Sequence, residues 1–126
     1  KDLRSPWLFL REVTFTQTVP KMDHLICFLP GALALDVLQN GFDGEAGRRV
    51  SANLSLLETS YTQELLIAHK LMQTCAHMYF RTVSDLAPEI TRFSVGLDDD
   101  EGSMHNILRP ETVESLFLMW RATRSQ

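Results

Sequence analysis

A long helix is the feature that most constrains the fold of this chain. The apolar residues that repeat at alternating steps of three and four are Leu65, Ala68, Met72, Cys75 and Tyr79, with Leu71 and Met78 widening the stripe. This spacing is that of one face of an α-helix. The pattern predicts a helix from about Ser60 to Val83, so any fold must accommodate one long amphipathic helix.

The region before this helix predicts shorter elements. From Leu8 to Val19, apolar and β-branched residues alternate imperfectly with polar ones, which indicates an irregular strand or hairpin. A helix is expected to restart at Pro30, whose fixed φ suits a first helical position, and to stop at Asn40-Gly41. From Gly41 to about Arg49 the chain is rich in glycine and charge, which predicts a loop.

The region after the long helix predicts an extended piece and an acidic loop. Pro88 separates the helix from a short extended segment over residues 90–95, and Asp98 to Gly102 form an acidic loop. Gly102 lies where an EF-hand would need its third ligand, which favours a solvated loop over a calcium loop. The histidines and cysteines lack CxxC and HExxH spacing, so we expect no metal site built from them.

The last predicted helix carries two acids in its first turn. Pro110 is expected at the first helical position, which places Glu111 and Glu114 on one side, facing away from the core. The apolar residues expected on the other side are Val113, Leu116, Phe117 and Trp120. Helix capping and an acid/base or sugar site both explain these acids. The helix N-terminus and Arg109 favour ionised Glu111, which suits a base better than an acid.

Composition excludes several classes of function. The chain has 126 residues, 44% of them hydrophobic, and carries 12 basic and 16 acidic side chains for a net charge of −4. These values fit one globular domain and argue against a nucleic-acid partner. The longest uncharged apolar run, Leu25 to Leu35, is too short to span a bilayer. Acyl transfer, phosphoryl transfer and dinucleotide motifs are absent from the sequence.

Four polar or reactive residues allow two interpretations each. His24 and Glu89 stand in apolar surroundings and are either hydrogen-bonded structural residues or parts of a site. Cys27 and Cys75 are either free buried thiols, as is ordinary in a cytosolic protein, or a bridge. The glycosylation pattern at Asn53 tilts the balance slightly toward a secretory compartment.

Four blocks of the sequence resemble one family. Lys21 to Gly31 resembles the KMDHLxCFxPG block of the class I α-1,2-mannosidases of glycoside hydrolase family 47. Leu71 to Cys75 is similar to the LMxTC helix of that family, and Ala87 to Ile90 to its SPEI block. His105 to Phe117 resembles HNxLRPETVESLF. The blocks follow the family order, and the last is long enough to be specific.

This resemblance implies a mainly α fold, a partial (α/α)7 barrel of helical hairpins with short β segments. Residues 1–126 would be an internal fragment of a single catalytic domain. The implied activity is calcium-dependent, inverting hydrolysis of terminal α-1,2-linked mannose from high-mannose N-glycans. Inversion needs two carboxyl groups about 6.5 to 9.5 Å apart, so that a water fits beside the sugar. Glu111 matches the glutamate of the RPE motif, the usual candidate for the base.

The resemblance also implies the roles of other residues. Arg109 and Glu114 would lie in the sugar pocket, where Glu114 would order the water shell of Ca²⁺. His24 and Glu89 would line the glycan-binding side. Cys27 and Cys75 match a disulfide pair of the family. This bridge and the Asn53 pattern indicate the lumen of the endoplasmic reticulum or the Golgi.

The chain departs from the family pattern at Ala87, where serine is usual, at Asp36, where glycine is frequent, and in a long stretch from Asn40 to Ser60. The KMDHL block favours a processing mannosidase over the degradation-enhancing relatives. Because the chain begins without methionine and stops just after a helix, both ends are expected to be cut. The general acid, the calcium-binding threonine and any membrane anchor would then lie outside it, and the fragment alone would be inactive.

Two other functions fit parts of the sequence. One is a catalytically inactive relative that binds mannose glycans in glycoprotein quality control. The other is a free-standing helical interaction domain whose resemblance to the family is accidental. This second alternative predicts a compact monomer with reduced cysteines.

Overall fold

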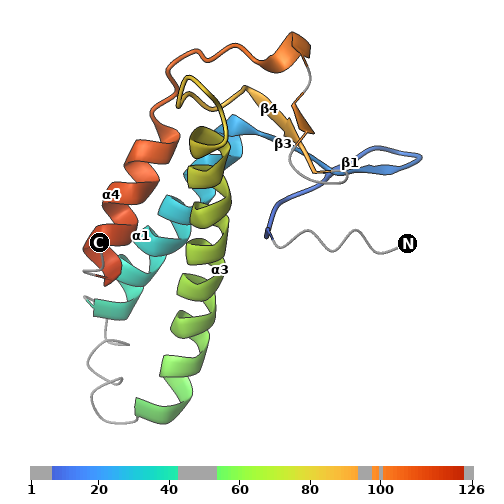
Figure 1. The fold of residues 1–126 in the computed structure, drawn as a ribbon. Helices are drawn as coiled ribbons and strands as arrows, with labels where there is room; N and C mark the ends of the chain where they lie inside the picture. The colour runs from blue at the N-terminus through green and yellow to red at the C-terminus, as the bar shows by residue number, and fades with distance from the viewer. Residues whose placement is uncertain (1–6, 43–53, 94–97, 100, 124–126) are drawn as a thin grey trace.

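Helices that pack side by side dominate the described part of the chain. The computed structural model describes residues 7–42, 54–93, 98–99 and 101–123, with side chains described over 7–39, 63–93 and 102–123. The helices α1 (Leu29–Phe42), α3 (Leu54–Phe80) and α4 (Glu111–Thr123) contact one another, and the strands lie beyond one end of them (Figure 1). The mainly helical fold is therefore confirmed for this segment.

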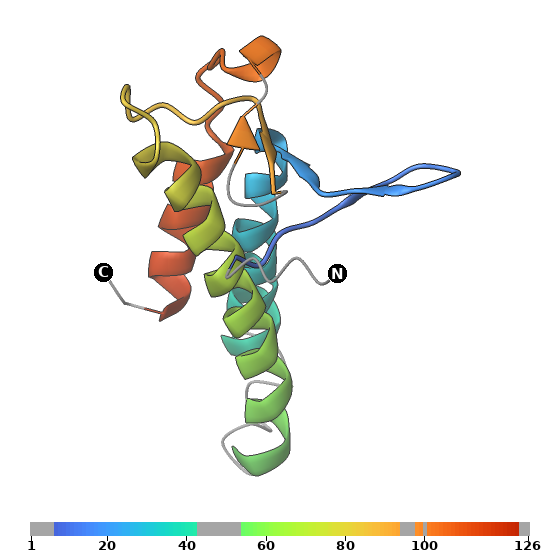
Figure 2. The same ribbon diagram turned by 45° about the vertical axis from the view of Figure 1, so that its right-hand side comes forward.

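The predicted hairpin is present near the N-terminus. β1 (Glu12–Val13) pairs antiparallel with β2 (Thr18–Val19), and the hairpin projects away from the helices (Figure 2). Its turn is closed by the Thr14 amide, which donates to the Gln17 carbonyl at 2.9 Å. Of the irregular strand or hairpin expected between Leu8 and Val19, the structure has a short hairpin.

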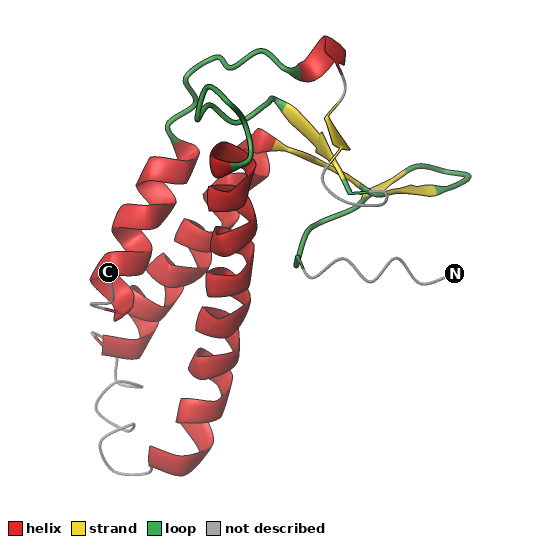
Figure 3. Cartoon of the chain, viewed as in Figure 1, coloured by secondary structure: helices red, strands yellow, loops and turns green. Residues whose placement is uncertain are grey.

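A second sheet joins segments that are far apart in sequence. β3 (Lys21–Asp23) pairs antiparallel with β4 (Ile90–Arg92), which pairs in turn with β5 (Asp98–Asp99) (Figure 3). The prediction of a loop at Asp98 was wrong, because β5 and the short helix η2 (Glu101–Ser103) occupy this segment. Aspartate is rare in strands, but here pairing with the backbone of β4 outweighs the low strand preference of aspartate.

Helix boundaries follow local signals closely at α1 and less closely at α3. The short helix η1 (His24–Phe28) is capped by Asp23, whose Oδ1 accepts from the Leu25 amide at 2.8 Å. It leads directly into α1, which carries Pro30 in its first turn as expected and ends just past the predicted stop. α3 begins earlier than predicted, at Leu54, and ends at Phe80. The loop was predicted from Gly41, but Gly41 and Phe42 belong to α1. The rest of this loop, up to Arg49, and Asn53 of the glycosylation pattern lie outside the described residues.

The predicted stripe of α3 forms the centre of the core. Its residues Ala68, Leu71, Met72, Cys75 and Met78 are all buried. They are joined in the core by residues from elsewhere in the chain, namely Met22, Cys27, Ala34, Ala87, Phe93 and Met119. No helix within the described ranges combines the length and apolar composition needed to cross a membrane.

The buried side of α4 differs from the prediction. The residues expected to face the core, Val113, Leu116, Phe117 and Trp120, are between 42% and 68% exposed. Thr112, Ser115 and Met119 are buried instead. The Ser115 hydroxyl donates to the Cys27 carbonyl at 2.5 Å and accepts from the Gly31 amide at 3.0 Å. This face of α4, which carries small polar residues, can be buried because the Ser115 hydroxyl has a partner both as donor and as acceptor.

Gly31 allows this close approach between α1 and α4. A Cβ atom at this position would lie 2.8 Å from the Ser115 Cα and 2.7 Å from its Oγ. Real Cβ atoms do not approach backbone atoms so closely, so any larger residue would push the two helices apart.

The sulfur atoms of Cys27 and Cys75 are bonded, with their Cα atoms 5.9 Å apart. The bridge ties η1 to α3 across 48 residues of sequence. The pairing that the family resemblance implied is therefore confirmed. A free-standing interaction domain was expected to have reduced cysteines, and that expectation is wrong.

The helix contact predicts a position-specific loss of stability. Gly31→Val should lower the free energy of unfolding by about 2 to 3 kcal/mol, because the added side chain overlaps the α4 backbone. Ala32→Val introduces the same side chain at the neighbouring exposed position and should cost less than about 1 kcal/mol. Urea unfolding of both variants checks this. Equal losses in the two variants would contradict the proposed contact.

The disulfide predicts a second loss of stability. Cys27→Ala combined with Cys75→Ala should lower the free energy of unfolding by about 3 to 4 kcal/mol, since the open chain gains entropy when unfolded. Reductant should destabilise the unsubstituted protein and leave the double variant unchanged. Thermal unfolding with and without dithiothreitol measures both effects. An equal response to reductant in the two proteins would contradict this account.

Candidate active site

Four predicted site residues meet at the N-terminal end of α4. We define the polar cluster as His24, Glu89, Arg109 and Glu111. His24 begins η1, Glu89 precedes β4, Arg109 lies in the loop before α4, and Glu111 begins that helix. Segments that are distant in sequence therefore supply one group of side chains.

Backbone hydrogen bonds hold Glu89 at the centre of this cluster. The pairing of β3 with β4 places Asp23 opposite Ile90. The His24 amide donates to the Glu89 carbonyl at 2.8 Å, and the Glu89 amide donates to the Ser103 carbonyl at 2.9 Å. Because both sides of its peptide backbone are bonded, Glu89 has little freedom to move relative to η1.

Glu89 and Arg109 form a hydrogen-bonded ion pair. Arg109 Nε donates to Glu89 Oε1 at 2.6 Å, and Nη2 contacts the same oxygen. The hydrogen bond from Arg109 holds the pKa of Glu89 below its ordinary value, although partial burial acts in the opposite direction. The same bond raises the pKa of Arg109. Both side chains are therefore charged at neutral pH, and Glu89 is a poor proton donor.

His24 is a buried histidine with hydroxyl partners. Its Nε2 lies 2.7 Å from Tyr79 Oη and 3.2 Å from Thr112 Oγ1. Burial lowers its pKa, while the nearby charges of Glu89 and Glu111 partly offset that effect. The imidazole is therefore neutral at pH 7, and its unprotonated nitrogen can accept from a hydroxyl. His24 connects η1, α3 and α4, so it is structural in its contacts and also part of the cluster.

Glu111 and Glu114 occupy different environments, contrary to the prediction that both face away from the core. Glu114 is exposed, as expected. Glu111 is half-buried, and its Oε2 is buried with no hydrogen-bond partner among the described residues. An unpaired buried carboxylate oxygen is costly, and such groups are concentrated at functional sites. Glu111 therefore differs from a carboxylate that merely caps a helix in solvent.

Three residues of the site region were missed by sequence reasoning. Tyr79 was predicted only as part of the core stripe, and Thr112 received no role. Asn106 accepts from the Leu108 amide at 2.8 Å and donates to the Ala87 carbonyl at 2.7 Å. The first bond closes a local turn that asparagine favours, in which its side chain accepts from the backbone amide two residues further along the chain. That preference, and the place of Asn106 in the HNxLRPETVESLF block, were the signals in the sequence that could have identified it.

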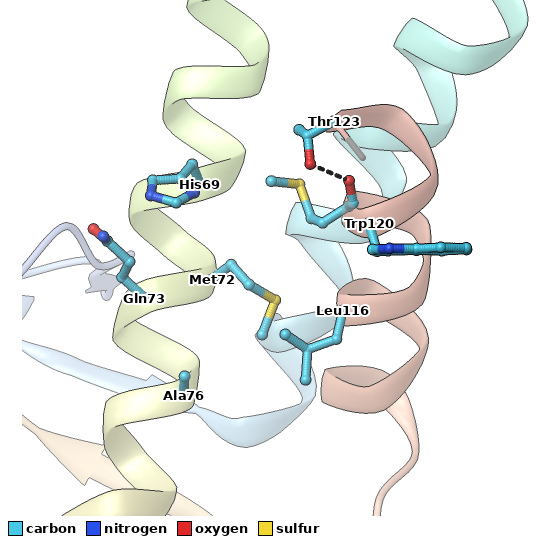
Figure 4. Close-up of a pocket in the computed structure, with 8 residues that line it drawn as sticks. His69, Met72, Gln73, Ala76, Leu116, Trp120 and Thr123 are labelled. Atoms are coloured by element: carbon cyan, nitrogen blue, oxygen red, sulfur yellow. Dashed lines mark hydrogen bonds between the residues drawn. The ribbon is translucent and has the colours of Figure 1, made fainter. Parts of the chain in front are cut away.

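Within the ranges described, no three His, Cys, Asp or Glu side chains come close enough to hold a metal ion. A cavity of about 220 Å³ lies between α3 and α4 (Figure 4). Its wall includes Met72 on α3 and Leu116 and Trp120 on α4. None of the polar cluster lines this cavity, which is mostly apolar, so it is distinct from the candidate site.

The chain is similar to known mannosidases. It is 44% identical to the endoplasmic reticulum mannosyl-oligosaccharide 1,2-alpha-mannosidase of Schizosaccharomyces pombe, over 86% of this chain and 21% of that protein. The human protein of the same name is 38% identical over 91% of this chain and 15% of its own length. The Saccharomyces cerevisiae protein is 37% identical over 82% of this chain and 21% of its length.

The chain thus spans about a fifth or less of the length of these relatives. The family model described as glycosyl hydrolase family 47 matches residues 2–126. This match includes every described element and all four residues of the polar cluster. The chain belongs to glycosyl hydrolase family 47.

Proposed function

We propose that this chain is an internal part of a calcium-dependent inverting α-1,2-mannosidase domain that removes terminal mannose from high-mannose N-glycans. Family membership and the names of the relatives support the glycosidase activity. The single observation that carries the residue assignment is the buried, unpartnered Oε2 of Glu111 beside His24 and the Glu89–Arg109 pair.

Glu111 has the properties that a general base needs. In an inverting glycosidase, one carboxylate removes a proton from the attacking water and a carboxylic acid on the opposite side protonates the leaving oxygen. Glu111 lies in the first turn of α4, close enough to the Arg109 guanidinium for the two charges to interact. Oε2 of Glu111 has no hydrogen-bond partner among the described residues and so keeps its capacity to accept a proton, whereas Glu89 has its Oε1 bonded to Arg109.

The general acid is assigned outside the described residues. Glu89 cannot take this role at neutral pH, because the hydrogen bond from Arg109 lowers its pKa. We instead assign the Glu89–Arg109 pair to sugar binding. A carboxylate has two acceptor oxygens and a guanidinium has five N–H donors, so the pair retains capacity for hydroxyl groups. His24, buried beside them, would hold the sugar-binding side in place.

Calcium would be bound with direct ligands from other parts of the domain. Calcium prefers oxygen ligands, including waters held by carboxylates. Glu114 is exposed near the start of α4 and fits a role in accepting hydrogen bonds from calcium-bound water. When bound, the ion would supply a positive charge that orients oxygen atoms of the sugar.

We place the protein in the secretory pathway, with the endoplasmic reticulum favoured over the Golgi. The relatives from both yeasts and from human are named as endoplasmic reticulum enzymes. The Cys27–Cys75 bridge is consistent with an oxidising lumen.

Glu111→Gln separates catalysis from helix capping. In the full-length protein, turnover of an α-1,2-linked mannose oligosaccharide should fall by about 10² to 10⁴-fold, because the amide cannot accept the proton. Affinity for the same oligosaccharide should change little, as measured by calorimetry. Unchanged turnover with a lower unfolding temperature would assign Glu111 to helix capping. An unsubstituted protein that binds the glycan without hydrolysing it would support the inactive glycan-binding alternative.

Glu114→Gln is the matched substitution, since it removes the other first-turn carboxylate of the same helix. We expect it to weaken calcium binding by about tenfold, as is typical when a group that supports metal-bound ligands is lost. Calcium titration by calorimetry measures this affinity, and excess calcium should restore turnover. Unchanged calcium affinity would remove Glu114 from the calcium site.

A further inference from the structure

Asn106 links two loops that carry the charged residues of the cluster. Its side-chain amide donates to the Ala87 carbonyl at 2.7 Å, two residues before Glu89. Its Oδ1 accepts from the Leu108 amide at 2.8 Å, one residue before Arg109. One side chain therefore bonds to the backbone next to both members of the ion pair.

Leu108 adopts a conformation that leucine rarely takes. Its φ is 55°, in the left-handed region that favours glycine. Its side chain is 80% exposed, so packing of the side chain does not explain this conformation. The hydrogen bond from its amide to Asn106 is the described contact that holds the backbone there.

The conformation of Leu108 determines where Arg109 points. Leu108 directly precedes Arg109, and Pro110 follows with its own φ fixed by its ring. With few free rotations left in this segment, the turn at Leu108 directs Arg109 back toward Glu89, where Nε and Oε1 are 2.6 Å apart. The same turn leads into the first turn of α4, where Glu111 lies. Strained backbone of this kind is typical of functional sites.

We propose that Asn106 is a positioning residue, which holds Leu108 in the left-handed conformation so that Arg109 pairs with Glu89 and Glu111 is correctly placed. The proposal rests on the mannosidase activity proposed above. In that activity Asn106 does not touch the sugar. It acts through Leu108 on Arg109, which binds the sugar, and on Glu111, the proposed base. Its loss should therefore both raise KM and lower kcat.

The test uses Asn106→Ala in the full-length protein with an α-1,2-linked mannose oligosaccharide as substrate. We expect kcat to fall by about tenfold, which equals about 1.4 kcal/mol in the barrier. The NMR signal of the Arg109 Nε–H group should shift and exchange faster with solvent, because its bond to Glu89 is weakened. Adding Leu108→Gly should recover much of both losses, since glycine adopts positive φ without strain.

Asp85 provides the matched control for this rescue. It also has a positive φ, 53°, but lies in the turn after α3 and not in the segment that leads to Arg109. Asp85→Gly added to Asn106→Ala removes a comparable strain and should restore neither kcat nor the Arg109 signal. Equal rescue by the two glycines would overturn the proposal, as would an Asn106→Ala variant with unchanged kcat and an unchanged Arg109 signal.

Asn106→Asp replaces Asn106→Ala if the alanine variant does not fold. It keeps the acceptor for the Leu108 amide and loses only the donor to the Ala87 carbonyl, so Leu108 should stay in its left-handed conformation, and kcat and the Arg109 signal should change little. A tenfold fall in kcat with this acceptor kept would overturn the proposal. If the unsubstituted protein hydrolyses no α-1,2-linked mannose, the proposed function fails. The Arg109 signal in the same variants still decides whether Asn106 positions the ion pair.

Discussion

The position of α4 depends on the hydroxyl of Ser115. This group donates to the Cys27 carbonyl and accepts from the Gly31 amide, so it joins the end of η1 and the start of α1 to one point of α4. Cys27 is itself bonded to α3 through Cys75. Thr112, one turn before Ser115, reaches His24. The buried polar side of α4 therefore fixes where its first turn lies, and Glu111 stands in that turn.

This arrangement gives two neighbouring carboxylates different hydrogen-bond partners. Glu89 is bonded to Arg109 and held ionised by that bond, which makes it suitable for binding and unsuitable for donating a proton. Glu111 shares the same positive surroundings but has an oxygen without a partner among the described side chains. A general base needs such a free oxygen. His24 is neutral beside both carboxylates because burial opposes its charged form.

Elements with local signals were predictable from the sequence, and long-range contacts were not. The stripe of α3 repeats within one helix, so its buried face was predicted correctly. The buried face of α4 was predicted wrongly, because hydrophobicity pointed to Phe117 and Trp120, whereas the partners of Ser115 lie 84 and 88 residues away in sequence. β5 was missed because its pairing comes from β4.

The site residues divide in the same way between local signals, which the sequence contains, and long-range contacts, which it does not. The resemblance to the family identified His24, Glu89, Arg109 and Glu111 as one group, but residue spacing alone left each of them open to a structural interpretation. The pairing of Cys27 with Cys75 also came from the resemblance. Only the ionised state of Glu111 was argued from local charge. The ion pair and the role of Asn106 needed the cross-loop geometry, which no local pattern contains.

The central claim is that Glu111 directs its free oxygen at the water that attacks the sugar. A crystal structure of the full-length protein with an uncleaved α-1,2-linked mannose disaccharide tests it most directly. We expect an ordered water about 2.6 to 3.2 Å from Glu111 Oε2, facing the anomeric carbon. A disaccharide bound with the Glu111 carboxylate facing only protein atoms or bulk solvent would contradict the claim.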